Sequence, residues 1–432
     1  MNNRLKELNG FALPLLIQFV FNNLIRLTDK AIVGHISTPA FNAVNLASST
    51  LFVIVGVLGA ITIVFNVRGG QKLGERDRSA FHFEFETSIF LSLMIGFIAF
   101  VVLLFSQRLI LSKVYALDGE SLEQGILFFT PMSFYVLLQL LIFAFTTYFK
   151  LHGQTRWILI GGVTSSLVNV AIDYLFALGS LGFPKLGIRV VGWSTILALA
   201  LNLSFYLYIL RKEIGFCLSR VKAYFKNAMM HLRLSLEIMA EEFLDGTLMV
   251  ILINAIVIRM GEAEYAGYSI LMELLGFLFL FKYIYGSAVL SLTSVARGRS
   301  DKRELASYPK IATVFTMLLY ALVGILLLLF RTRVPAIISN DFAAQKVASD
   351  FMLAFVAANF ISQMSYVYRC ALQSMEKFRF VLYSTFPIQL FALLLMWFWT
   401  RTGSLLGVAA AQFVGEILMS AVYYRKYQRE LA

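Results

Sequence analysis

The first apolar run of the chain carries polar side chains that hydrocarbon disfavours. Asn22, Arg26 and Asp29 are spaced i, i+4 and i+7, so a helix places them on one face. Lys30 follows directly, which puts two cationic groups beside one carboxylate. An ionisable group near the centre of a membrane helix costs roughly 2.5–3.5 kcal/mol and is therefore a candidate for function. We expect Asp29 to bind an ion and the other three residues to line a water-filled cavity. The alternative is an Arg26–Asp29 pair that only fixes packing.

A second polar pair lies in the fifth apolar run. Asn169 and Asp173 are spaced i, i+4, and Ser165 and Ser166 lie one turn earlier. Because removal from water favours the protonated form of a carboxyl group, such an Asp can take up and release a proton. We expect Asn169 and Asp173 to form an ion-binding site. The alternative is a hydrogen-bonded Asp near a helix end.

An acidic cluster opens the seventh apolar run, with Glu237, Glu241, Glu242 and Asp245. Carboxylates this close together must share protons, bind a hard cation such as Na⁺, or pair with basic groups. We expect Glu241 and Asp245 to form a second ion-binding site. The alternative is that part of the cluster lies at the cytoplasmic interface, where it costs little. Four residues in other runs are candidate partners: Glu273, Lys282, Arg369 and Glu416.

These residues must be positioned by membrane helices. The chain is 59% apolar and only 14% charged, whereas a soluble protein carries about 25% charged residues. Runs this long exclude the shorter, alternating strands of a membrane barrel. Neither the two cysteines nor the four histidines have metal-ligand spacing, and no phosphate-binding loop is present, so we expect no metal and no cofactor. We predict twelve spans, at about 11–34, 43–68, 86–106, 124–149, 156–178, 190–211, 232–258, 265–295, 308–330, 346–373, 378–400 and 404–424.

The net charge of +12 follows membrane topology and does not indicate a nucleic-acid partner. Of the 37 Lys and Arg residues, 24 fall in connections on one side of the predicted spans and nine on the other. Positive residues accumulate on the cytoplasmic side. We therefore expect both termini in the cytoplasm. We also expect a monomer that contacts lipid, in a bacterial inner or plasma membrane.

Two pairs of segments indicate an internal duplication. The segment Leu151–Trp157 (LHGQTRW) is similar to Leu372–Phe378 (LQSMEKF), 221 residues later. The segment Gly74–Asp77 (GERD) is similar to Gly298–Asp301 (GRSD), 224 residues later. We expect two similar lobes, residues 1–215 and 216–432, joined by a basic connection. Such duplication is typical of secondary transporters, in which one half moves against the other around a site between them.

The order of several motifs resembles the multidrug and toxic compound extrusion (MATE) family. Leu13-Pro14-Leu15 followed by Leu27–Gly34 (LTDKAIVG) is similar to the opening of the first helix in that family. Asn169–Asp173 (NVAID) resembles the fifth-span motif, and Leu181–Ile188 (LGFPKLGI) resembles the stretch before the sixth span. The duplicated turns after the fourth and tenth spans also resemble family segments. The resemblance covers essentially the whole chain.

The resemblance implies an all-α polytopic membrane protein, with twelve helices in two six-helix lobes related by a pseudo-twofold axis around a V-shaped cavity. It implies export of a drug or metabolite by antiport with H⁺ or Na⁺. It assigns the coupling site to Asp29, Asn169 and Asp173, and a bend of the first helix to Pro14. On this basis we expect the remaining candidates to line the substrate cavity: Asn22, Arg26, Lys30, Glu237, Glu273 and Arg369.

Three departures from the family pattern bear on the function. Lys30 replaces a small residue, Arg26 adds a second cation beside Asp29, and Tyr174 replaces a proline after Asp173. Two bases beside Asp29 weaken a simple proton-carrier role and make an anionic, zwitterionic or lipid-linked substrate compatible with the site. A flippase for a lipid-linked oligosaccharide or cell-wall precursor is therefore the alternative function. An enzyme would need a convergent catalytic or metal constellation, and the sequence has none that we recognise.

Overall fold

The computed structural model describes residues 2–215, 218–402 and 404–432, without the side chains of residues 2, 3, 23–27, 29, 30, 38, 218 and 402. Every regular element in this described part is a helix. By packing, the chain separates into two compact units. The N-unit holds residues 13–235, and the C-unit holds residues 1–12 and 236–432. The two lobes expected from the duplication, residues 1–215 and 216–432, are defined by the sequence repeat and not by packing. Their boundaries stay a prediction.

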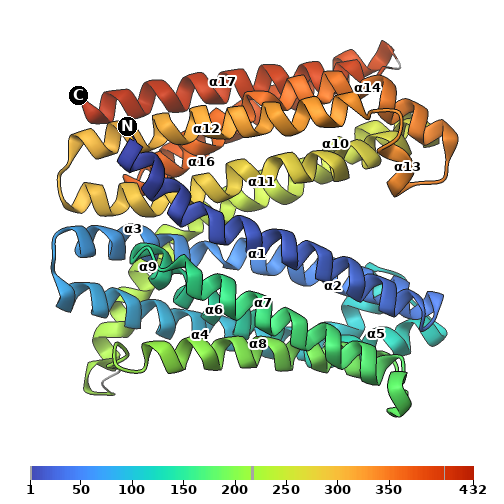
Figure 1. Ribbon diagram of the computed structural model, residues 1–432, viewed down its shortest axis with the longest axis horizontal. Coiled ribbons are helices and arrows are strands. Elements are labelled where there is room, and N and C mark those ends of the chain that lie inside the picture. The colour runs from blue at the N-terminus through green and yellow to red at the C-terminus, as the bar shows by residue number, and fades with distance from the viewer. Residues whose placement is uncertain (1, 216–217, 403) are drawn as a thin grey trace. The chain divides into compact units, whose positions relative to one another are not determined.

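The N-unit is a bundle of membrane-length helices in which α4 packs on α3 and α6, and α8 packs on α5 and α7 (Figure 1). Two of its spans each consist of two consecutive helices. One span is interrupted at Gly59 and the other after Met132. Its helices are α1 (Asn2–Gly34) from Leu13 onward, α2 (Thr38–Leu58), α3 (Ala60–Gly74), α4 (Arg78–Leu109), α5 (Gly119–Met132), α6 (Tyr135–Leu151), α7 (Thr155–Ile172), α8 (Ile188–Leu210) and α9 (Val221–Phe243) up to Ser235.

The C-unit is built around α11, which packs against α12, α14 and α15, while α17 packs against α15 and α16 (Figure 1). A π-helical turn, Leu244–Leu248, joins the end of α9 to α10. The helices of this unit are the start of α1, the end of α9, α10 (Met249–Val257), α11 (Glu262–Gly298), α12 (Lys302–Leu329), α13 (Pro335–Ile338), α14 (Phe342–Phe360), α15 (Ser362–Ser374), α16 (Phe378–Trp399) and α17 (Leu406–Leu431).

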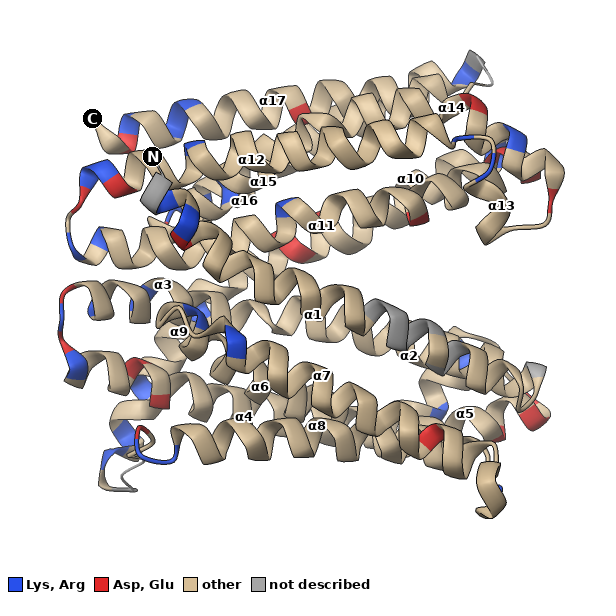
Figure 2. Cartoon of the chain, viewed as in Figure 1, with Lys and Arg blue, Asp and Glu red and all other residues tan. Residues whose placement is uncertain are grey.

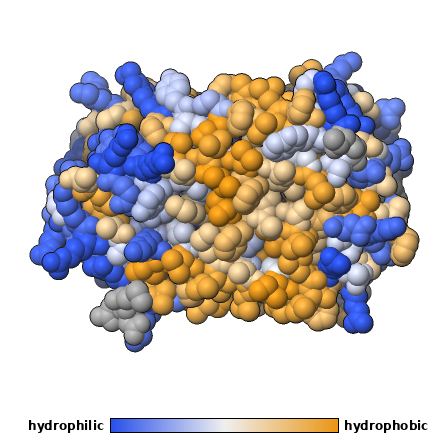
Figure 3. Space-filling model, turned by 90° about the horizontal axis from the view of Figure 1, so that it is seen from above, coloured by the Kyte–Doolittle hydropathy of each residue, from blue (hydrophilic) through white to orange (hydrophobic). Residues whose placement is uncertain are grey.

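The helices have the length and composition that a bilayer requires. Eleven segments of the described residues are long and apolar enough to cross a membrane, and α1 adds a further helix of 33 residues. Figure 3 shows one face of the molecule, where apolar side chains form a broad band between hydrophilic ends. Large apolar side chains lie exposed on the helices, for example Phe105 at 82% exposure, as is expected of a surface that faces lipid. The predicted all-helical membrane fold is confirmed.

The duplicated turns have the same local backbone. Gly153 and Glu376 both adopt the left-handed conformation, with φ of 65° and 59°, so the backbones of these two turns correspond two residues away from the register in which the sequence segments were paired. Arg76 and Ser300, with φ of 63° and 57°, correspond in the expected register. The residue after each member of the second pair, Asp77 or Asp301, caps the next helix by accepting backbone N–H groups.

The cap at Asp301 also affects its ionisation. The backbone N–H groups of Glu304 and Arg303 lower the pKa of Asp301, because they favour its charged form. The similarity of the segments Gly74–Asp77 and Gly298–Asp301 therefore reflects the same turn-and-cap structure.

The first turns of α1 are anchored within the C-unit. Tyr308 donates to Glu7 over 2.6 Å, Tyr285 donates to Asn9 over 2.8 Å, and Arg4 donates to Ser307 over 2.8 Å. From Leu13 onward the same helix belongs to the N-unit. Pro14, the predicted hinge, follows this transition directly and lacks the N–H that would bond to the preceding turn. Its role as a hinge stays a prediction.

Candidate functional site

Asp173 lies in a buried hydrogen-bond cluster of the N-unit. Its side chain is fully buried, and Ser194 Oγ of α8 donates to Asp173 Oδ1 over 2.5 Å. Asn169 Nδ2 lies 3.5 Å from Asp173 Oδ2 and donates to Ser194 Oγ over 3.0 Å. The structure therefore brings together Asn169 and Asp173, as expected from their spacing, and adds a hydroxyl group from a second helix.

The backbone around this cluster departs from regular α-helix. α7 ends at Ile172, and a π-helical turn runs from Asp173 to Ala177. Such turns occur frequently at functional sites, where they redirect a side chain. Gly161 lets α8 approach closely, since a Cβ there would lie 2.4 Å from Asn202 Oδ1 and 2.6 Å from the Tyr206 ring. α7 and α8 therefore pack closely near Gly161, and Ser194 of α8 reaches Asp173 at the other end of the same helix pair.

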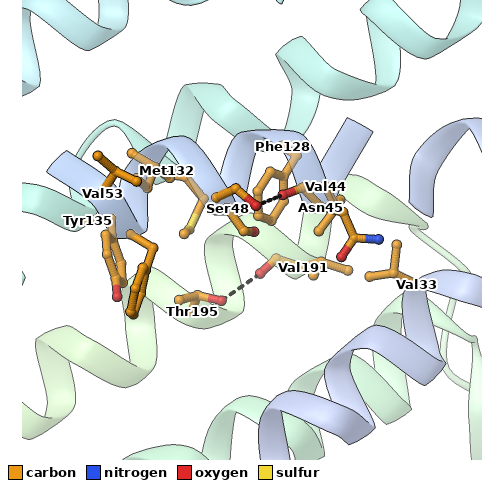
Figure 4. A pocket seen from close by; sticks show the side chains of 13 residues that line it. Val33, Val44, Asn45, Ser48, Val53, Phe128, Met132, Tyr135, Val191 and Thr195 are labelled. Carbon is orange, nitrogen blue, oxygen red and sulfur yellow. Dashed lines mark hydrogen bonds between the residues drawn. The ribbon is translucent and has the colours of Figure 1, made fainter. Parts of the chain in front are cut away.

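A cavity of about 480 Å³ lies beside the cluster within the N-unit (Figure 4). Thr195 forms part of its wall, and Thr195 Oγ1 lies 3.5 Å from Asn169 Nδ2. The cavity and the Asp173 cluster therefore share a wall. Its lining comes from α1, α2, α5, α6 and α8: Val33, Val44, Asn45, Ser48, Ser49, Leu51, Phe52, Val53, Phe128, Met132, Tyr135, Val191 and Thr195.

The lining of this cavity is apolar and aromatic with a few neutral polar groups. Figure 4 shows Met132, Phe128 and Tyr135 around the space, with the hydroxyl group of Thr195 on one side. Thr195 Oγ1 donates to the Val191 carbonyl over 3.0 Å. Among the described residues, no charged side chain lines the cavity. Its volume lies within the range of sites that bind drug-sized molecules, about 300–1,000 Å³.

The predicted stripe of the first helix is only partly described. Asn22 is exposed, and Ser166 Oγ of α7 lies 3.3 Å from Asn22 Oδ1. The side chains of Arg26, Asp29 and Lys30 lie outside the described residues. The grouping of Asp29 with Asp173 therefore stays a prediction.

In the C-unit, Arg369 of α15 binds three carboxylates. Its guanidinium nitrogens lie 2.9 Å from Glu241 Oε1, 2.6 Å from Glu242 Oε1 and 3.1 Å from Asp245 Oδ2. Arg369 is 8% exposed and Glu241 is 2% exposed. A buried guanidinium is stable only when carboxylates compensate the loss of hydration. The acidic cluster of the seventh span is thus held by an internal counter-ion.

Two amide side chains complete this cluster. Gln373 donates to Glu241 over 3.1 Å, and Gln389 donates to Asp245 over 2.8 Å. Asp245 lies in the π-helical turn that follows α9, just as Asp173 begins the turn that follows α7. Both candidate ion sites therefore lie at irregular helix segments that the sequence did not predict.

The other predicted residues of the C-unit lie apart from this cluster. Glu237 forms an ion pair of 2.6 Å with Arg379, whose side chain is 70% exposed. Glu273 is exposed on α11, and no ion pair or hydrogen bond involves it among the described residues. Figure 2 shows that charged residues gather at helix ends and that a few occur midway along α11 and α17.

Sequence reasoning missed the residues contributed by neighbouring helices. Ser194 and Thr195 are ordinary small residues of an apolar span, so nothing in their local pattern marks them. Gln373 and Gln389 lack charge and were not singled out. Lys282 and Glu416 were identified only as candidate partners, and each is bonded to a serine of α15. An intramembrane polar group opposite a carboxylate can be found only once helix neighbours are known.

Comparison with known proteins gives one family and one fold. Residues 14–175 and 240–398 match the family model described as MatE. A probable multidrug resistance protein NorM from Thermotoga maritima is 25% identical over 344 residues, which cover 78% of this chain and 72% of that protein. The multidrug resistance protein NorM of Vibrio cholerae is 21% identical over 361 residues, covering 79% and 75%.

Solved structures share the same fold at low sequence identity. A crystal structure of MATE in complex with MaL6 aligns with a TM-score of 0.86 and 17% identity, over 99% of this chain and 96% of that one. A multidrug resistance MATE family transporter of the MOP superfamily, in an outward-facing conformation, aligns with a TM-score of 0.83 and 15% identity, over 99% and 95%. These alignments confirm the twelve-helix, two-lobe fold.

Proposed function

The chain belongs to the MatE family, and on that premise we propose that it is a secondary antiporter that exports an organic compound from the cytoplasm while H⁺ or Na⁺ enters. The relatives named multidrug resistance proteins support a drug or a drug-like metabolite as the substrate. We expect no catalysed chemical reaction and no cofactor. The charge asymmetry of the connections supports a cytoplasmic position for both termini in an inner or plasma membrane.

The observation that carries this proposal is the wall shared by a drug-sized cavity and a buried carboxyl group. The cavity has the volume and the aromatic lining that suit the apolar part of an organic molecule. Thr195 faces the cavity and also lies beside Asn169, the neighbour of Asp173. A change in the charge of Asp173 can therefore alter the cavity wall through the side chains of Asn169 and Thr195.

Protonation of Asp173 would alter the hydrogen bonds that join α7 to α8. As a carboxylate, Asp173 accepts hydrogen bonds from its neighbours, including Ser194. A protonated carboxyl group also carries a donor, so Ser194 and Asn169 would have to reorient. Because Thr195 follows Ser194 on α8, that rearrangement would change the cavity wall. The driving force is the ion gradient, about 2.3 kcal/mol per charge for each 100 mV of membrane potential.

The coupling ion and substrate would then compete in one unit. Loading of the ion at Asp173 favours one arrangement of the wall, and the bound substrate favours the other. A ligand shifts such an equilibrium only by its difference in affinity between the two states. Competition between ion and substrate therefore supplies the exchange that antiport requires.

The surroundings of Arg369 in the C-unit argue against this residue as a binding group for the lipid-linked alternative. A pyrophosphate group would need cationic groups that are free to bind it. The guanidinium group of Arg369 already contacts Glu241, Glu242 and Asp245, which leaves no positive charge to spare at that point.

The test uses purified protein in liposomes with a fluorescent aromatic dye as the transported probe. H⁺ and Na⁺ gradients are imposed separately, and dye movement is followed in the wild type and in Asp173→Asn. We expect the wild type to export dye under one gradient and Asp173→Asn to lose that driven export. Dye binding at equilibrium should persist in the variant, because its cavity lining is unchanged.

Asp118→Asn is the matched control, since Asp118 is an exposed residue of the same unit. It should transport like the wild type. Full gradient-driven export by Asp173→Asn would remove this residue from the coupling mechanism. Absence of dye export by the wild type under either gradient would contradict the exporter function for this class of probe.

A further inference from the structure

Glu416 lies midway along α17 in the C-unit and has an unusual environment for a membrane carboxyl group. It is half-buried, and Ser365 Oγ of α15 donates to Glu416 Oε2 over 2.5 Å. Among the described residues, no basic nitrogen lies within ion-pair distance of it. Glu416 therefore has no direct counter-ion and is bonded to a neutral hydroxyl group.

Lys282 of α11 has a complementary environment. Its ammonium group is buried and donates to Ser362 Oγ over 3.1 Å. It also lies 4.2 Å from the centre of the Phe279 ring, a favourable cation–π distance. Within the described part of the chain, no carboxylate pairs with it directly. Ser362 and Ser365 are spaced i, i+3 and so lie one helical turn apart on α15.

The Arg369 cluster differs from this pair in one decisive way. Each of its three carboxylates has a direct guanidinium contact, so each keeps its charge compensated while α9 and α15 stay together. Glu416 and Lys282 are instead each bonded to a neutral serine, and the two serines lie on the same face of α15. Loss of charge on Glu416 breaks no salt bridge, whereas loss of charge on Glu241 does.

We propose that Glu416 is a second proton-carrying residue of this transporter. In this proposal Lys282 is a positioning residue, because its positive charge, bonded to Ser362 one turn from Ser365 on α15, stabilises the Glu416 carboxylate. This inference rests on the proposed antiport function and adds a proton site in the C-unit. The carboxylate takes one proton from hydronium, which leaves water and a neutral carboxyl group bonded to Ser365. Release reverses the step, and Lys282 stabilises the carboxylate that forms.

The surroundings favour a proton over Na⁺ at this position. A sodium ion needs several oxygen ligands, whereas one carboxylate and one serine hydroxyl face each other here. The ammonium group of Lys282 would repel a second cation, but it does not oppose a proton that neutralises the carboxylate. The other charged or titratable groups that act on Glu416 are Asp245, Arg369, Tyr283 on α11 and Tyr320 on α12.

The experiment combines infrared spectroscopy with proton counting. The carbonyl stretching band of protonated carboxyl groups is titrated with pH in the purified wild type and in Glu416→Gln. We expect the variant to lose one titrating component of this band. In liposomes under an imposed pH gradient, protons and dye molecules are counted together, and the variant should carry fewer protons for each dye molecule.

Two further variants keep the result decisive. Glu416→Asp retains a carboxyl group and should recover the titrating band, which separates loss of the acid from a folding defect. Lys282→Met should move the midpoint of that band to higher pH, because the carboxylate loses its stabilising charge. Glu430→Gln is the control for the proton count and should carry as many protons for each dye molecule as the wild type, since Glu430 lies near the end of the same helix in an ordinary ion pair with Lys426 and Lys377.

An unchanged infrared titration in a folded Glu416→Gln would overturn the proposal, and so would an unchanged proton count. Failure of the wild type to export dye would contradict the proposed function instead. In that case the infrared titration still decides whether Glu416 carries a proton. The two failures are therefore distinguishable.

Discussion

Arg369 forms more ion pairs than any other described residue of the C-unit. It compensates Glu241, Glu242 and Asp245 within a membrane-spanning bundle. Removal of one partner from a buried ion pair leaves uncompensated charge, which typically costs about 3–5 kcal/mol. The cluster is therefore sensitive to Arg369 in a way that no single carboxylate matches.

We expect Arg369→Gln to lower the free energy of unfolding by about 3 kcal/mol or more, because three carboxylates lose their counter-ion. The measurement is thermal unfolding in detergent at neutral pH. Arg379→Gln is the control, since Arg379 pairs with Glu237 at an exposed position and should contribute less than about 1 kcal/mol. Equal stability losses in the two variants would show that the Arg369 contacts are no more stabilising than a surface pair.

Residue-level prediction from the sequence depended on charge and spacing. The i, i+4 spacing of Asn169 and Asp173 brings them together as expected, and Arg369 was recognised as a partner for acidic residues. Ser194 was not found, because it is 21 positions from Asp173 and serine is common in membrane helices. Charge marks a residue as costly in lipid, whereas a hydroxyl group costs too little to stand out.

At the scale of elements, the turns after α6 and α15 have the same backbone conformation but place different residues, Gly153 and Glu376, at its left-handed position. Gly153 and Glu376 adopt the same left-handed backbone, yet only glycine adopts it without steric cost. A Cβ added at Gly153 would contact nothing within 4 Å, so the cost of a substitution there is a backbone cost.

We expect Gly153→Ala to destabilise the protein by about 1 kcal/mol and Glu376→Gly to stabilise it, because the turn conformation penalises a side chain. Thermal unfolding of both variants in the same detergent measures the two signs. Gly10→Ala, within regular helix and with open space around its Cβ, is the control and should not destabilise. Stabilisation by Gly153→Ala would contradict the turn geometry.

The spans could be predicted from hydropathy, but their interruptions could not. The predicted span 43–68 corresponds to α2 and α3 with a break at Gly59, and 124–149 corresponds to α5 and α6. The π-helical turns at Asp173 and Asp245 were likewise unmarked. Inside a uniformly apolar run, periodicity carries little information about local backbone geometry, since most faces are apolar.

At the scale of the whole molecule, α1 and α9 each contribute to both packing units. The sequence duplication predicts two halves, but it does not indicate which unit a shared helix joins. Residues 1–12 join the C-unit through contacts such as Tyr308–Glu7, and these depend on side chains about 300 positions apart. Such long-range contacts are set by the fold and have no local signature.

The charge asymmetry makes a prediction about the orientation of the whole chain. With 24 Lys and Arg residues in connections on one side and nine on the other, both termini should remain in the cytoplasm. We expect protease sites added at either terminus to be cut in inverted membrane vesicles and protected in right-side-out vesicles. A site inserted beside Leu181, which is 82% exposed in the connection between α7 and α8, should behave in the opposite way. If the terminal sites are cut from the outer side, the transporter is inverted, and the ion gradient that we propose to drive export would drive uptake.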